Sequence, residues 1–79
     1  MRIDKFLKVS RLIKRRTVAK EACEQGRITI NGRSAKAGGE VKTGDIIKIQ
    51  FGAGELSARV LKLNESCKKE DVSDMYEII

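Results

Sequence analysis

The chain has 79 residues, of which 41% are apolar and 35% charged, with no His and a formal net charge of +6. This length allows one small domain with little room for a deep pocket, because so short a chain buries only roughly 60% of its unfolded surface. The apolar share is too high for a disordered chain, and no apolar run reaches the ~20 residues of a membrane span. Since the N-terminus lacks a signal-peptide pattern, we expect one cytoplasmic domain over residues 1–79.

The first expected element is an amphipathic helix over residues 4–13, because Phe6, Val9, Leu12 and Ile13 recur at helical spacing. Asp4 falls in its first turn, where a negative charge suits the helix dipole. It also precedes Lys8 by four residues, the favourable order for an ion pair. We therefore expect Asp4 to orient Lys8 or Arg11 and not to bind a phosphate itself.

A second helix is expected from about residue 15 to 25, with an apolar stripe of Val18, Ala19, Ala22 and Cys23. Gly26 is placed to end this helix in the left-handed conformation. No Pro or Gly separates the two predicted helices, so polar residues must form the turn between them.

After Gly26 the apolar period changes from helical to alternating, which is typical of strands. Asn31-Gly32 is the strongest short signal for a hairpin, and Gly52-Ala53-Gly54 reads as a second turn. Strand-like segments are found at 27–30, 46–51 (read as buried) and 55–63, and residues 75–79 form either a closing strand or an apolar hook. A polar stretch, 64–74, precedes the last of these. The predicted fold class is α+β: two N-terminal helices packed on a small antiparallel β-sheet.

Positive charge is concentrated at the N-terminus. Residues 1–20 hold eight Lys or Arg and one acid, whereas residues 21–79 hold nine basic and ten acidic residues. A solvated helix face is the ordinary explanation of such a run, but an excess confined to a quarter of the chain favours a polyanionic partner. The candidate RNA-binding residues are Arg2, Lys8, Arg11, Lys14, Arg15, Arg16, Lys20, Arg27 and Lys36.

Arg16 is the strongest candidate among them, because three cations surround the start of the second helix, where backbone amides also favour an anion. We expect its replacement by Ala to weaken RNA binding and to change folding stability by at most about 0.5 kcal/mol. Three scattered aromatic residues, Phe6, Phe51 and Tyr76, do not form a platform for stacked bases. Structured RNA read by shape and phosphate contacts fits better.

Catalytic and metal-binding residue types are scarce. Without His, the commonest general base and the Ser-His and Cys-His pairs are missing. Cys23 and Cys67 are far apart, cannot fill a four-ligand zinc site, and are expected to be free thiols. Composition leaves Ser-Lys chemistry open, although no spacing suggests it. We therefore predict a protein that is not an enzyme and has no catalytic residue, metal or cofactor.

An ordered series of short motifs resembles the S4 (S-four, or alpha-L) RNA-binding domain. The series is Arg2-Ile3-Asp4-Lys5-Phe6-Leu7, Ser10-Arg11-Leu12, Arg15-Arg16-Thr17-Val18-Ala19, Gly26-Arg27-Ile28-Thr29-Ile30-Asn31-Gly32, Val41 and Gly44-Asp45. It covers about residues 2–49 and leaves 50–79 for C-terminal strands and a tail. Two positions depart from the family pattern: Ile3 stands for the usual Leu, and Arg15 for a frequent Ser.

The resemblance implies an RNA-binding module with Arg2 and Arg11 among its contacts. The length and the ending, Lys68-Lys69-Glu70 through Met75-Tyr76, are similar to those of free-standing bacterial members that act in ribosome-associated quality control. That similarity implies binding to large-subunit ribosomal RNA and P-site peptidyl-tRNA, beside the factor that adds C-terminal alanine tails. The expected protein is a monomer without membrane contact.

Three other functions stay open at the level of sequence. The first is a general recycling factor for heat-damaged large subunits, within the same family. The second is a DNA-binding helix-turn-helix protein, since two short basic helices also suit a major groove. The third is an accessory subunit of an RNA-modifying enzyme.

Overall fold

A computed structural model describes residues 1–36, 38–63 and 74–79 of the chain. The helices are α1 (Ile3–Val9) and α2 (Arg16–Glu24), and the strands are β1 (Ile28–Ile30), β2 (Arg33–Ser34), β3 (Ile46–Phe51), β4 (Gly54–Val60) and β5 (Tyr76–Ile78). All described strand pairs are antiparallel, in the spatial order β2-β1-β3-β4-β5. The predicted α+β class is confirmed, and the C-terminal residues form a strand rather than a hook.

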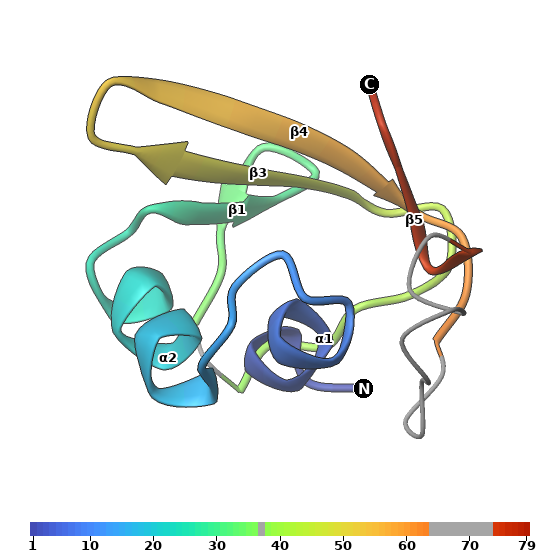
Figure 1. Cartoon of the computed structure of the whole chain (residues 1–79), viewed down its shortest axis with the longest axis horizontal. Helices are drawn as coiled ribbons and strands as arrows, with labels where there is room; N and C mark the ends of the chain where they lie inside the picture. The colour runs from blue at the N-terminus through green and yellow to red at the C-terminus, as the bar shows by residue number, and fades with distance from the viewer. Residues whose placement is uncertain (37, 64–73) are drawn as a thin grey trace.

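Both helices lie against the same face of the sheet (Figure 1). Ile47 and Ile49 of β3 point to this face and are almost completely buried, whereas the intervening Lys48 is exposed on the other face. The core between the layers consists of Ile3, Phe6, Leu7, Ala19, Cys23, Ile28, Ala35, Val41, Ile47, Ile49, Val60 and Met75. The helices are therefore fixed by their apolar sides, and their basic sides face solvent.

Helix α1 is shorter than its apolar spacing predicts, because it ends at Val9 rather than at residue 13. Arg11 has a left-handed backbone, φ 62°, and its N–H donates to the Lys8 carbonyl at 3.1 Å. The N–H of Ile13 then donates to the Leu7 carbonyl at 3.0 Å. These bonds satisfy carbonyls that a helix end leaves open. As predicted, a polar residue makes the turn between the helices.

Helix α2 has nearly the predicted bounds, and Gly26 ends it as predicted, with φ 73°. The Gly26 N–H donates to the Cys23 carbonyl and the Arg27 N–H to the Ala22 carbonyl, the two bonds of a Schellman motif. One residue of the predicted apolar stripe is misplaced: Val18 is 47% exposed, because the short helix buries only its Ala19 and Cys23 side.

The Asn31-Gly32 hairpin forms as predicted, with positive φ at both residues, as the mirror-image turn requires. The Asn31 side chain also ties the turn to the start of β3. Its Nδ2 donates to Asp45 Oδ1 at 3.0 Å, and its Oδ1 accepts from the Ile46 N–H at 3.0 Å. Asn31 is thus a structural residue.

Replacement of Asn31 by Ala should lower the free energy of unfolding by about 1–2 kcal/mol, because both side-chain bonds and the tolerance for positive φ are lost. In a thermal melt, the midpoint should fall by roughly 5–15 °C. Asn31→Gly is the control. Because Gly also tolerates positive φ, this variant should lower the melting midpoint less than Asn31→Ala does. Equal melting of Asn31→Ala and the parent would contradict this role.

The polar stretch predicted at 64–74 lies outside the described residues, apart from Asp74, and Cys67 lies outside them too. In the described part of the chain, no helix is long and apolar enough to cross a membrane.

Candidate nucleic-acid interface

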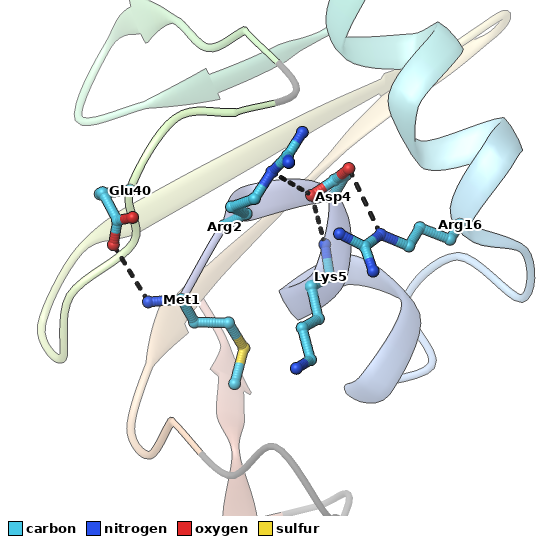
Figure 2. Close-up of polar contacts among 6 residues, drawn as sticks. All are labelled: Met1, Arg2, Asp4, Lys5, Arg16 and Glu40. Atoms are coloured by element: carbon cyan, nitrogen blue, oxygen red, sulfur yellow. Dashed lines mark hydrogen bonds and ion pairs between the residues drawn. The ribbon is translucent and has the colours of Figure 1, made fainter.

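The centre of the basic surface is a buried carboxylate. Asp4 lies in the first turn of α1 and is only 3% exposed. Its Oδ1 accepts a 2.8 Å hydrogen bond from the Lys5 backbone N–H and lies 3.5 Å from Arg2 Nε. Its Oδ2 accepts from Arg16 Nε at 3.4 Å (Figure 2). One buried acid therefore joins arginines from the start of α1 and the start of α2.

Both arginine side chains stay about half exposed, at 52% for Arg2 and 47% for Arg16. Each contact to Asp4 uses Nε, which leaves the two terminal nitrogens of each guanidinium for another acceptor. Guanidinium groups bind phosphate through such pairs of N–H groups. The arrangement places two half-exposed guanidinium groups at the α1–α2 junction, with terminal nitrogens of the kind that binds an anion.

The partners of Asp4 differ from those expected. The spacing along α1 favours Lys8 or Arg11, but in the structure Asp4 contacts Arg2 and Arg16. Arg11 lies beyond the end of α1, so the predicted continuous helix face does not exist. The pairing with Arg16 spans 12 positions and depends on the packing of α1 against α2, which helical spacing does not describe.

The same pairing changes the expectation for Arg16. A residue at the edge of a solvated helix would be neutral for folding, whereas Arg16 neutralises part of a buried charge. Removal of one partner of a buried ion pair leaves the other charge uncompensated, and this destabilises the fold. Solvent screens the half-exposed Arg16, and Arg2 still pairs with Asp4 when Arg16 is removed. We therefore expect Arg16→Ala to lower the free energy of unfolding by about 1 kcal/mol, more than the limit of about 0.5 kcal/mol expected from the sequence.

Five of the remaining candidate residues fall into two groups around this centre. Lys14 and Arg15 precede α2 and Lys20 lies one turn after Arg16, all exposed. Lys8 and Arg11 are exposed at the opposite end of α1 from Arg2.

Lys36 is brought close to Arg2 although 34 positions separate them. The Lys36 carbonyl accepts from the Gly39 N–H at 2.8 Å, and the Gly39 carbonyl accepts from the Ile3 N–H at 2.8 Å. A Cβ added to Gly39 would lie 3.0 Å from the Lys36 carbonyl oxygen, and one added to Gly38 would lie 3.8 Å from Arg2 Nη2. The Gly38-Gly39 pair therefore lets this turn approach the N-terminus.

The N-terminus itself is fixed beside that turn. The amino group of Met1 donates to Glu40 at 3.1 Å (Figure 2), and the Val41 N–H donates to the Met1 carbonyl at 2.9 Å. Arg2 and Glu40 form an antiparallel bridge. The backbone of Arg2 is thus held in place before its side chain meets any ligand.

Arg27 lies apart from this centre, just after the C-terminal end of α2. Nine residues of helix at 1.5 Å each separate the two ends, or roughly 14 Å. Arg27 therefore belongs to a different part of the surface from Arg2 and Arg16.

Cys23 is a free, buried thiol on the inner side of α2. Burial raises its pKa from 9.0 to about 11, and the charges of Asp4 and Glu24 add to the effect. The thiol is therefore protonated at neutral pH, and it is a poor nucleophile. Among the described residues, no group of three or more His, Cys, Asp or Glu is placed to hold a metal ion.

The raised pKa of Cys23 predicts a pH dependence of stability. The unfolded chain loses this proton near pH 9 and the folded chain near pH 11, so the free energy of unfolding should fall as pH rises through that window. Urea unfolding at pH 8 and pH 10.5 measures this fall. Because other groups titrate as well, the comparison is with Cys23→Ala, which should show a smaller fall. Identical pH profiles would contradict the assignment.

The comparison with known proteins fits this geometry. The family model of the S4 domain matches residues 1–47. The chain belongs to the S4 domain family. The resemblance seen in the motif series is thereby confirmed, and the matched region contains both helices, the first hairpin and the Arg2–Asp4–Arg16 contacts.

Relatives of the S4 chain cover nearly its whole length. A protein of Halalkalibacterium halodurans named RQC P-site tRNA stabilizing factor is 58% identical over 78 residues, which are 99% of this chain and 89% of that protein. A protein of the same name from Listeria monocytogenes is 57% identical, over 100% of this chain and 86% of that one. The structure of heat shock protein 15 from Vibrio cholerae superposes with a TM-score of 0.90 at 26% identity, over 100% of this chain and 81% of that one.

Proposed function

We propose that this S4 protein is a non-catalytic RNA-binding factor of the ribosome, which binds large-subunit ribosomal RNA and P-site tRNA. The observation that carries the proposal is the buried Asp4 carboxylate between the two half-exposed guanidinium groups of Arg2 and Arg16. The names of its relatives, which refer to stabilisation of P-site tRNA, support the choice of partner.

In the proposed mechanism the protein acts by contact alone. Arg2 and Arg16 bind backbone phosphates, and Lys14, Arg15, Lys20 and Lys36 extend the positive surface on both sides. A cytoplasmic protein bound in this way braces peptidyl-tRNA in the P site of an obstructed large subunit. We further propose that this allows a tailing factor to add C-terminal alanine residues to the nascent chain.

The salt dependence of binding tests the electrostatic part of the proposal. If about five phosphates are neutralised, the logarithm of the affinity should fall with the logarithm of the salt concentration with a slope of roughly −3 to −5. The measurement is sedimentation with purified large ribosomal subunits at a series of KCl concentrations. An affinity that is unchanged between 50 mM and 200 mM KCl would contradict phosphate binding.

A second candidate function is the recycling of heat-damaged large subunits, which the structural likeness to heat shock protein 15 favours. Stabilisation of P-site tRNA and recycling of damaged subunits differ in whether the large subunit must hold peptidyl-tRNA. Stabilisation of P-site tRNA requires tighter binding to large subunits with peptidyl-tRNA than to empty ones. Equal binding to both would favour the recycling function.

A further inference from the structure

A polar hollow lies at the far end of α2 from Arg16. Its volume is about 310 Å³, and it is lined by Gln25, Arg27, Gln50, Phe51 and Gly52. These residues come from the segment that follows α2 and from the β3–β4 hairpin, which lie at the same end of the molecule in Figure 1. Among these lining residues the one charged side chain is positive. The hollow therefore suits a small ligand that has both a polar and an anionic part.

Phe51 is the unexpected feature of this hollow. It continues the alternation of Ile47 and Ile49 on the helix-covered face, so the apolar run predicts a buried ring, yet Phe51 is 49% exposed. Two causes are visible: α2 ends at Glu24, and the cross-strand partner of Phe51 is Gly54, which has no side chain. An aromatic surface is thus open to a planar ligand.

The backbone holds the cation and the ring in one place. The Gln50 N–H donates to the Arg27 carbonyl at 2.8 Å, and the Arg27 N–H donates to the Ala22 carbonyl at 2.9 Å. The first bond joins the start of the sheet to the end of β3, and the second belongs to the cap of α2. Little ordering of the backbone is therefore needed when a ligand binds.

We propose that this hollow takes one unstacked nucleobase of the bound RNA. The proposal rests on the proposed RNA-binding function and adds a base contact to its phosphate contacts. The base stacks on Phe51, as every nucleobase has a π-face that fits an aromatic ring. The Arg27 guanidinium binds the adjoining phosphate, and the Gln25 and Gln50 amides offer donors and acceptors to the base edge.

RNA fits this hollow better than a protein side chain does. An apolar anchor residue would cover Phe51 but would leave the Gln25 and Gln50 amides without partners, which is costly. A nucleotide supplies a stacking surface, polar edges and an anion together. The roughly 14 Å between Arg16 and the end of α2 lets one RNA segment reach both places across a few nucleotides.

The test uses two RNA hairpins at low salt, identical except that one carries a single bulged adenosine. The parent protein should bind the bulged hairpin at least about fivefold more tightly, the lower end of the range for stacking of one base. Phe51→Ala should lose this preference and keep its affinity for the paired hairpin. Phe51→Tyr should keep the preference, and thermal melts of both variants check folding.

The outcomes separate this inference from the function on which it rests. Arg16→Ala should weaken binding to both hairpins equally and keep the preference for the bulge. Equal binding of both hairpins by the parent, or a preference that survives Phe51→Ala, overturns the nucleobase site alone. A different result is that the Phe51→Ala variant keeps the bulge preference but no longer binds to the ribosomal complex. That result would make the hollow a protein-docking site. Failure to bind either hairpin or large subunits overturns the proposed function as well.

The absence of Trp from the chain provides a direct readout in addition. Phe51→Trp places a single indole in the hollow. Stacking of the bulged adenosine on this indole should quench its fluorescence emission. The paired hairpin should leave the emission nearly unchanged at the same degree of saturation. Quenching by both hairpins to the same extent would overturn the proposal.

Discussion

Arg16→Ala should weaken binding to large ribosomal subunits by about 10- to 150-fold, which corresponds to the roughly 1.5–3 kcal/mol of a hydrogen bond to a charged group. The loss should be large because Asp4 already orients the Arg16 guanidinium, so that no side-chain ordering opposes its contact with phosphate. Sedimentation of the variant and the parent with purified large subunits measures the ratio of affinities.

Arg59→Ala is the matched control. Arg59 is 48% exposed, similar to Arg16, and it also pairs with an acid, at 2.7 Å from Glu77. It follows the buried Ala58 on β4 and therefore lies on the face of the sheet without helices. Both variants lose one positive charge and one ion pair. If Arg59→Ala weakens binding as much as Arg16→Ala, net charge rather than the proposed surface governs the affinity.

Asp4→Asn should weaken RNA binding about tenfold even though it makes the protein more positive. The amide keeps the shape of the side chain and an acceptor for the Lys5 N–H, but it no longer attracts Arg2 and Arg16. Both guanidinium groups then lose their orientation and must be ordered on binding. An account based on charge alone predicts the opposite sign, namely tighter binding.

Glu77→Gln is the control for that sign. It also removes one negative charge and releases an arginine, but on the other face of the sheet. Its affinity for large subunits should equal or slightly exceed that of the parent. A thermal melt of each variant separates loss of fold from loss of orientation. If a folded Asp4→Asn variant binds as tightly as Glu77→Gln, Asp4 does not position the arginines.

The elements whose signals are local could be predicted from the sequence. Gly26 and Asn31-Gly32 act through their own backbone angles, and the structure confirms both turns. The apolar run 46–51 predicts a buried strand, and of its residues Ile47 and Ile49 lie in the core. The concentration of charge in residues 1–20 indicated the basic side of the helices, because most of that excess lies on or between α1 and α2.

The features that depend on how elements pack could not be read in this way. The partner of Asp4 is Arg16 across the helix pair, whereas helical spacing considers only neighbours on one helix. Val18 is exposed because α2 buries only its Ala19 and Cys23 side, and Phe51 is exposed because α2 ends at Glu24 and the cross-strand partner Gly54 has no side chain. Apolar periodicity reports which side faces a core and not how far that core extends.

The central claim is that the buried Asp4 carboxylate orients Arg2 and Arg16 so that both bind RNA. A double-mutant cycle tests this claim most directly. The affinity for large ribosomal subunits is measured for the parent, Asp4→Asn, Arg16→Ala and the double variant. Because part of the effect of Asp4 acts through Arg16, Asp4→Asn should cost clearly less in the Arg16→Ala background than in the parent. Strictly additive losses would contradict this coupling.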